Sequence, residues 1–132
     1  SNQFFYSENQ FYVIVMKEAL PADKSITITL KFNYNLTSGL SGFYRSSYNT
    51  SNGTTGYLAT TQFEPTDARR AFPCFDEPAF KANFTIHVTH DCHYTAVSNM
   101  PVSSISGDTT CAGTAGNTVT TNFQTSVKMS TY

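Results

Sequence analysis

Apolar and polar side chains alternate along several short segments of the chain. The clearest example is "SITITLKFNYNL" (25–36), and its apolar side chains fall on one face: Ile26, Ile28, Leu30, Phe32 and Tyr34. A period of two is typical of a strand that buries one face and leaves the other to solvent. The pattern predicts an antiparallel strand whose apolar face points into a core.

Other segments are rich in aromatic and β-branched residues and are bounded by Gly, Asn, Pro or Ser, which predicts further strands. These segments are residues 10–17, 56–64, 83–90, 94–99, 118–126 and 127–132. No helical apolar period lasts three turns, and the one expected helix is short, beginning near Pro65 and continuing through "TDARRAF".

Two stretches dominated by Ser, Thr, Asn and Gly, residues 46–56 and 104–118, are expected to be loops. With many short strands and one short helix, the chain is predicted to be all-β, either an antiparallel β-sandwich or a curved pair of sheets.

The composition narrows the function classes. The 132 residues suit one domain, and a net charge of -1 offers no basic surface for nucleic acid. No apolar run approaches the roughly 20 residues that a membrane-spanning helix needs. The chain starts without Met, and its last segment reads as a strand with no turn after it. We therefore expect a fragment of a larger protein.

Four N-x-S/T sequons favour a secreted or cell-surface protein, with the lumen of the endoplasmic reticulum as the alternative. Their asparagines are Asn35, Asn49, Asn52 and Asn83, and those in the polar loop, Asn49 and Asn52, are the most accessible candidates for glycosylation.

The chain has three cysteines, so one is left over or has a partner outside this sequence. Cys92 and Cys111 flank a polar stretch and are predicted to close a loop by pairing. Cys74, between Pro73 and Phe75, is expected to remain a buried thiol.

Charged residues make up 13% of the chain, yet six of them gather between positions 64 and 77: Glu64, Asp67, Arg69, Arg70, Asp76 and Glu77. This passage follows a predicted strand in which Gln62 and Glu64 share one face, because side chains of a strand repeat every two residues.

The passage "TTQFEPTDARRAFPCFDEPAFKANFTI" (60–86) resembles the N-terminal domain signature of the aminopeptidase N family of zinc metallopeptidases, with "ARRAFPCFDEP" its most specific part. "GFYRSSY" (42–48) is similar to the family's strand before that signature. "VSNMP" (97–101) comes after the signature, in the order in which the family has these features. The resemblance implies that residues 1–132 are a partial, saddle-shaped N-terminal β-domain, which packs on a thermolysin-like catalytic domain of the same parent chain.

The resemblance also implies an activity, the release of N-terminal residues from peptide substrates by a zinc enzyme. The family's H-E-x-x-H and G-x-M-E-N motifs do not occur here. The zinc and the catalytic residues are therefore expected outside this fragment, which alone should be inactive. Gln62 corresponds to a residue that lines the pocket for the first side chain of the substrate, and Glu64 to one near its free amine.

Other interpretations stay open. Glu64 can simply cap the short helix, and the clustered charges are best explained as ion pairs that fix a turn. His87, His90, Cys92 and His93 invite a metal site, but their spacing favours surface or hydrogen-bonded histidines. The alternative for the whole chain is a non-catalytic, glycosylated binding or receptor module, or a family member without zinc.

Overall fold

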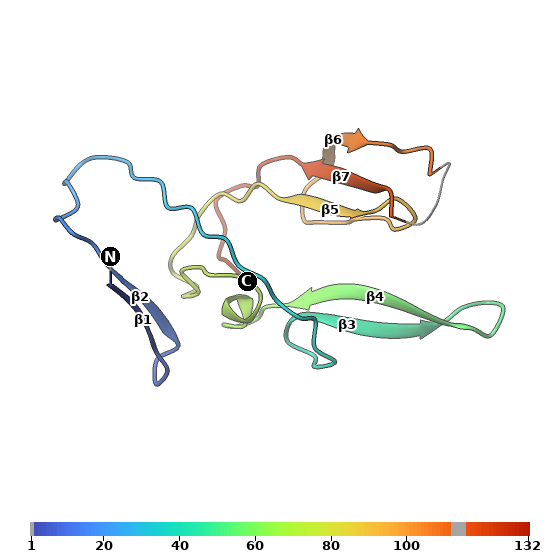
Figure 1. The fold of residues 1–132 in the computed structure, drawn as a ribbon, viewed down its shortest axis with the longest axis horizontal. Coiled ribbons are helices and arrows are strands. Elements are labelled where there is room, and N and C mark those ends of the chain that lie inside the picture. Colours follow the sequence, from blue (N-terminus) through green and yellow to red (C-terminus); the bar gives the residue numbers. More distant parts are fainter. Residues whose placement is uncertain (1, 112–115) are drawn as a thin grey trace. The chain divides into compact units, whose positions relative to one another are not determined.

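A computed structural model describes residues 2–111 and 116–132, and within these ranges the protein is built almost entirely from β-strands (Figure 1). The chain divides into two compact units, Ser1–Cys74 and Phe75–Tyr132. Every pair of strands in the described ranges is antiparallel. Their only helical element is one 3-10 turn. The predicted all-β class is confirmed.

The first unit contains two hairpins. Strand β1 (Asn2–Tyr6) pairs with β2 (Phe11–Val15), and β3 (Gly42–Asn49) pairs with β4 (Thr55–Gln62). The sequence predicted β2, β3 and β4. It did not predict β1, because the aromatic residues of "NQFFY" are consecutive and do not alternate with polar ones.

The loop expected at residues 46–56 is shorter than predicted. Strand β3 continues to Asn49 and β4 begins at Thr55, so only residues 50–54 connect them. Backbone hydrogen bonds of the ladder do not depend on the side chain, which is why a Ser- and Asn-rich sequence still forms strand here.

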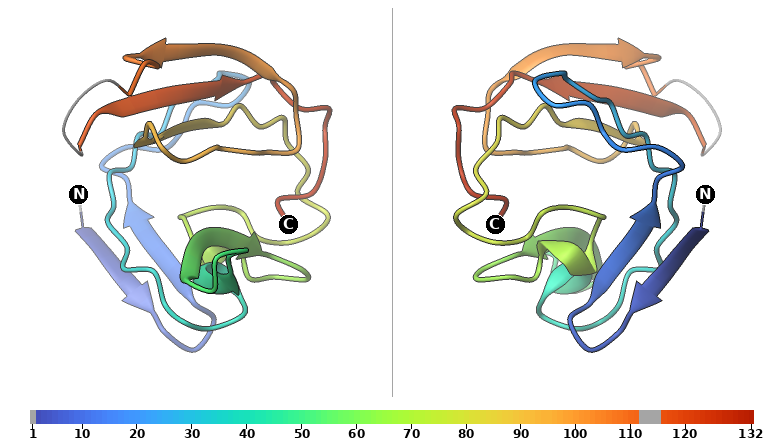
Figure 2. Two further views of the ribbon diagram at one scale, coloured as in Figure 1. Left: turned by 90° about the vertical axis from the view of Figure 1, so that its right-hand side faces the viewer. Right: turned by 90° about the vertical axis from the view of Figure 1, so that its left-hand side faces the viewer.

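The strand predicted at residues 25–36 is not formed. No strand is assigned to this segment, which runs without an arrow in every view (Figure 1, Figure 2). Its apolar side chains are 41% to 58% exposed, with Leu30 at 42% and Ile28 at 58%. Alternation provides a face that can be buried, but a strand also needs a neighbouring strand to complete its hydrogen bonds. No such neighbour pairs with this segment among the described residues.

The second unit contains a three-stranded sheet of order β5-β7-β6. Its strands are β5 (His87–Asp91), β6 (Val102–Gly107) and β7 (Thr118–Phe123). The central strand β7 buries every second residue: Val119, Thr121 and Phe123 are 3% to 5% exposed. The buried hydroxyl of Thr121 is satisfied by Nε2 of His90 at 2.9 Å.

Three predictions for this unit need correction. Only the second half of the segment 83–90 becomes strand, with Phe84 and Val88 half-buried and Ile86 39% exposed. Residues 94–99 form no strand. Strand β6 occupies the start of the expected 104–118 loop, because β7 supplies it with a partner edge. Residues 112–115 of that expected loop lie outside the described residues.

The segment 127–132 is held by single contacts and not by a ladder. Met129 makes one antiparallel bridge with Ala82, Ser130 Oγ donates to the Pro78 carbonyl at 2.6 Å, and Thr131 Oγ1 donates to the Phe75 carbonyl at 2.9 Å. Hydroxyl side chains thus take the place of the strand pairing that the sequence predicted.

The predicted short helix is a three-residue 3-10 turn, η1 (Ala68–Arg70), whose Ala68 is fully buried. The described residues contain no helix of the length and apolar character that crossing a bilayer would require.

Candidate functional site

The candidate site lies where β4 ends and the chain turns toward η1. Gln62 is the last residue of β4 and pairs across the hairpin with Gly42. Because glycine has no side chain, Gln62 has no side chain directly opposite it on the neighbouring strand. Gln62 and Glu64 are both exposed.

Phe63, between these two residues, anchors the junction. Its ring meets that of Phe72 edge to face, with centroids 6.0 Å apart. Its carbonyl accepts a hydrogen bond of 2.8 Å from the backbone N–H of Asp67. Phe63 is therefore fixed through both its ring and its backbone. Its neighbours Gln62 and Glu64 are exposed to solvent on either side of this fixed residue.

Glu64 does not cap the following turn. The residue at the N-cap of η1 is Asp67, no side chain donates or accepts a capping hydrogen bond there, and the first turn carries no acidic residue. The helix-cap interpretation of Glu64 therefore has no support in the local geometry. Among the described residues, the carboxylate of Glu64 forms no hydrogen bond and no ion pair.

The clustered charges include one ion pair that closes the turn. Nε of Arg70 lies 2.6 Å from Oδ1 of Asp67, three residues earlier. The Arg70 side chain is 59% exposed, so solvent screens this pair and its contribution to stability is about 1 kcal/mol or less. Arg69 and Asp76 each have an interaction of their own, and Asp76 is buried at 7% exposure.

The histidines are hydrogen-bonded, as the sequence interpretation favoured. Nδ1 of His87 lies 2.7 Å from Oδ1 of Asn122, on the neighbouring strand β7. His90 uses both ring nitrogens, with Nδ1 2.8 Å from the Asp91 carbonyl and Nε2 bonded to Thr121.

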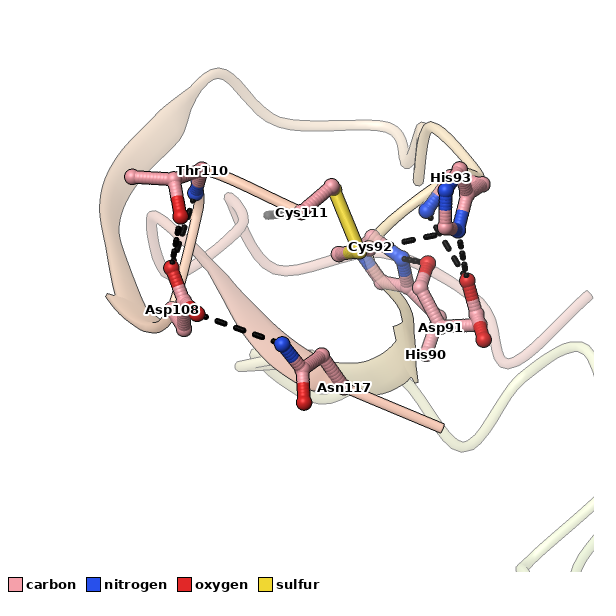
Figure 3. Close-up of a disulfide and its surroundings, with 8 residues drawn as sticks. All are labelled: His90, Asp91, Cys92, His93, Asp108, Thr110, Cys111 and Asn117. Carbon is pink, nitrogen blue, oxygen red and sulfur yellow. Dashed lines mark hydrogen bonds and ion pairs between the residues drawn. A yellow bond between two sulfur atoms is a disulfide. The ribbon is translucent and has the colours of Figure 1, made fainter. Parts of the chain in front are cut away.

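A disulfide joins Cys92 to Cys111, as predicted, with their Cα atoms 5.8 Å apart (Figure 3). It ties the end of β5 to the chain that leaves β6. Cys74 takes no part in this disulfide and is half-buried, which corrects the expectation of a buried thiol.

Residues 2–111 and 116–132 contain one group of potential metal ligands, which consists of Cys92, His93 and Cys111. Their ligand atoms lie within 4.8 Å of one another. The group does not suit zinc, because both sulfur atoms are consumed by the disulfide and metal binding requires thiolates. The sequence alone does not indicate that Cys111 lies near His93, because eighteen positions separate them and only the pairing of the strands brings them together.

Two carboxyl groups near the disulfide have lowered pKa values. The pKa of Asp91 lies below its usual 3.8, chiefly because its carboxylate accepts hydrogen bonds from the backbone N–H and the ring of His93. The pKa of Asp108 is lowered by hydrogen bonds from the hydroxyl and then the backbone N–H of Thr110. Figure 3 shows both carboxylates beside the bridge, where Asp108 also accepts from Asn117 at 3.2 Å. Asp91 thereby stabilises the turn that follows β5, and Asp108 joins the two ends of the connection between β6 and β7.

The four sequons lie in different environments. Asn35 belongs to the extended segment 25–36, Asn49 ends β3, and Asn52 lies in the hairpin connection. Asn83 is tied down, since its Nδ2 donates to the Ser126 carbonyl at 2.7 Å.

Comparison with known protein families gives one match that covers the whole chain. The family described as the Peptidase M1 N-terminal domain matches residues 1–132.

Curated relatives agree with this match. The chain is 41% identical over 128 residues to endoplasmic reticulum aminopeptidase 2 of Bos taurus. That match covers 96% of this chain and 13% of the relative. It is 44% identical over 129 residues to aminopeptidase A of Gloydius brevicauda, covering 97% of this chain and 13% of the relative. It is 40% identical over 129 residues to the thyrotropin-releasing hormone-degrading ectoenzyme of Homo sapiens. That match covers 98% of this chain and 11% of the relative. The chain thus spans only a small part of the length of these relatives.

Proposed function

Because this chain belongs to the Peptidase M1 N-terminal domain family, we propose that it is the N-terminal β-domain of an aminopeptidase that releases N-terminal residues from peptides. The parent chain would carry a separate catalytic domain. Support comes from relatives at 41% and 44% identity that are named as aminopeptidases.

Within that enzyme, Glu64 holds the free amine of the peptide. An aminopeptidase must tell a free N-terminus from an internal amide, and a carboxylate recognises the ammonium group by charge and by hydrogen bonding. The observation that carries this assignment is the exposed Glu64 carboxylate, which no partner among the described residues occupies, on a junction anchored by Phe63.

Gln62 contacts the first side chain of the substrate. It is exposed at the end of β4 and pairs with Gly42 across the hairpin, so strand β3 places no side chain directly opposite it. Its amide offers both a donor and an acceptor, which suits contact with substrate side chains of different polarity.

The zinc ion of this enzyme binds outside residues 1–132. The potential ligand group of the described residues, around Cys92 and Cys111, lacks thiolates and does not fit the metal. Zinc would supply the Lewis acid that polarises the scissile carbonyl. No step of that chemistry is assigned to residues of this chain, so the chain alone is inactive.

The parent protein enters the secretory pathway and acts at the cell surface or in the lumen of the endoplasmic reticulum. Four sequons and a disulfide support this location. The names of the relatives point the same way, since they include an ectoenzyme and an endoplasmic reticulum enzyme.

Steady-state kinetics of the full-length protein on aminoacyl substrates tests the proposal. Glu64→Gln keeps the shape of the side chain but removes its charge, and a hydrogen bond to a charged group is worth about 1.5–3 kcal/mol. We therefore expect kcat/KM to fall about 10- to 100-fold. The matched control is Glu77→Gln, which neutralises another exposed carboxylate of the same charged passage and should leave kcat/KM unchanged.

Two results would contradict the proposal. If the wild-type protein hydrolyses no aminoacyl substrate, the chain belongs to a non-catalytic binding module. If the enzyme is active and Glu64→Gln is as active as the wild type, the amine is bound without Glu64.

A further inference from the structure

The connection between β3 and β4 is a compact turn that carries two consecutive sequons, 49–51 and 52–54. The backbone N–H of Thr50 donates to the Thr54 carbonyl at 2.8 Å, and that of Gly53 donates to the Thr50 carbonyl at 3.0 Å. Gly53 has a φ of 81°, which suits glycine. These bonds fix the second sequon, Asn52-Gly53-Thr54, in one conformation.

The amide of Asn52 is oriented by its oxygen alone. Oδ1 accepts hydrogen bonds from the backbone N–H of Thr54 at 3.2 Å and from the Thr54 hydroxyl at 2.8 Å, and it lies 2.5 Å from the Thr50 hydroxyl. The nitrogen Nδ2, which is the atom that carries an N-linked sugar, has no hydrogen-bond partner within the described parts of the chain. The hydroxyl that completes the sequon is therefore already in contact with its asparagine.

The surroundings of Asn52 leave room for a bulky group. Residues 51–55 are all exposed. A Cβ placed on the adjacent Gly53 would meet no atom within 4 Å. A sugar on Nδ2 would therefore displace no packed side chain.

The sequon at Asn83 has the opposite geometry. Its Nδ2 donates to the carbonyl of Ser126 at 2.7 Å in a part-buried contact. Ser126 itself is 5% exposed, and its hydroxyl accepts from the backbone N–H of Phe84 at 2.9 Å. A sugar on Asn83 would crowd this contact, which ties the chain that precedes β5 to the chain that leaves β7.

We propose that Asn52 is an N-glycosylation site of this protein and that Asn83 stays unmodified. The donor is a lipid-linked oligosaccharide pyrophosphate. A bond forms between Nδ2 of Asn52 and the anomeric carbon of the first sugar, while the bond from that carbon to the pyrophosphate oxygen breaks. The lipid pyrophosphate leaves with the electron pair, and one amide proton passes to a base of the transferase. This inference does not rest on the peptidase activity.

The test is site-by-site mass spectrometry of the full-length protein secreted by eukaryotic cells. An amidase that removes N-glycans in heavy-oxygen water converts each glycosylated Asn to Asp and labels it. We expect the label at Asn52 and none at Asn83. An unlabelled Asn52, or a labelled Asn83, overturns the proposal.

Variants give an independent measurement. Asn52→Gln and Thr54→Ala should each lower the mass of the secreted protein by one glycan. Thr54→Ser keeps the hydroxyl and should retain the glycan, and Asn83→Gln should leave the glycan mass unchanged. A glycan mass unaffected by Asn52→Gln contradicts the assignment.

Discussion

Gly42 and Arg70 touch, although twenty-eight positions separate them. A Cβ added to Gly42 would lie 2.7 Å from Cβ of Arg70, closer than real Cβ atoms approach. Gly42 is buried, has a φ of 73°, and pairs with Gln62 across the β3–β4 hairpin. One glycine therefore connects the candidate site on β4 to the turn η1.

Gly42→Ala should destabilise this part of the protein. Alanine at a left-handed φ costs about 1–2 kcal/mol, and the clash with Arg70 adds about 1–3 kcal/mol. We expect hydrogen exchange in the full-length protein to show the local opening free energy of residues 42–70 lowered by about 2–5 kcal/mol.

Gly53→Ala is the matched control for this variant. Gly53 also has a positive φ, 81°, but nothing lies within 4 Å of the added Cβ. Its cost should be limited to about 1–2 kcal/mol, and confined to the hairpin tip. Equal effects of the two substitutions would show that the contact with Arg70 does not matter.

The disulfide should stabilise the sheet of the second unit. Cys92 and Cys111 are 19 positions apart, and a bridge closing a loop of that size contributes about 3 kcal/mol in the chain-entropy model. Replacing both cysteines by alanine should increase hydrogen exchange in β5 and β7, whereas Cys74→Ala should not affect β7. Alkylation of Cys92 or Cys111 in the unreduced, denatured protein would contradict the pairing.

The hydrogen bonds from His93 to Asp91 predict a pH dependence. The pKa of Asp91 is lowered below its usual 3.8 in the folded protein. Its contribution to stability is therefore complete above that value, and is lost as the pH falls through the folded pKa. Protection of residues 91–93 against hydrogen exchange, corrected for the intrinsic rate, should fall as the pH drops below the usual Asp pKa of 3.8. In Asp91→Asn the protection should be lower at neutral pH and the acid-dependent loss attributable to Asp91 should be absent.

The disulfide also predicts that His93 has no role in binding zinc. With both sulfur atoms in the bridge, the group of Cys92, His93 and Cys111 offers a single imidazole. His93→Ala in the full-length protein should leave the zinc content, measured by elemental analysis, unchanged. A loss of one zinc per chain would show that the group binds metal after all.

Local pattern predicts the strands that find a neighbouring strand to pair with. Most of the predicted strands 56–64 and 118–126 became β4 and β7, because each has the composition of a strand and a neighbour to pair with; β4 ends at Gln62, so Glu64 lies beyond the strand in which it was expected, and β7 ends at Phe123. Residues 25–36 have the clearest alternation in the chain, yet they form no ladder in the structure. Periodicity describes a face that suits burial, but it does not specify what covers that face.

The candidate site is predictable only in part for the same reason. Gln62 and Glu64 were selected as site residues because the charged passage resembles the family signature, and both residues are exposed. The supporting contacts, Phe63 on Phe72 and Gly42 against Arg70, are tertiary contacts that no local pattern reveals. That Gly42 lies directly opposite Gln62 could be recognised only once the register of β3 and β4 was known.

The last prediction concerns Gln62 and the selectivity of the proposed enzyme. Gln62 is exposed at the end of β4, so its amide is accessible to the first side chain of a substrate, while Glu64 would hold the amine. Gln62→Ala should therefore alter the ranking of kcat/KM among aminoacyl substrates, with changes of about 2- to 10-fold between polar and apolar first residues, because one lost hydrogen bond is worth about 0.5–1.5 kcal/mol.

The control is Thr61→Ala. Thr61 is also exposed on β4, but adjacent side chains of a strand point to opposite faces. It should leave the ranking intact. Kinetics on a panel of substrates with different first residues measures both variants. A uniform decrease for every substrate would place Gln62 in amine binding or in the stability of the hairpin. An unchanged ranking with unchanged rates would remove it from the pocket.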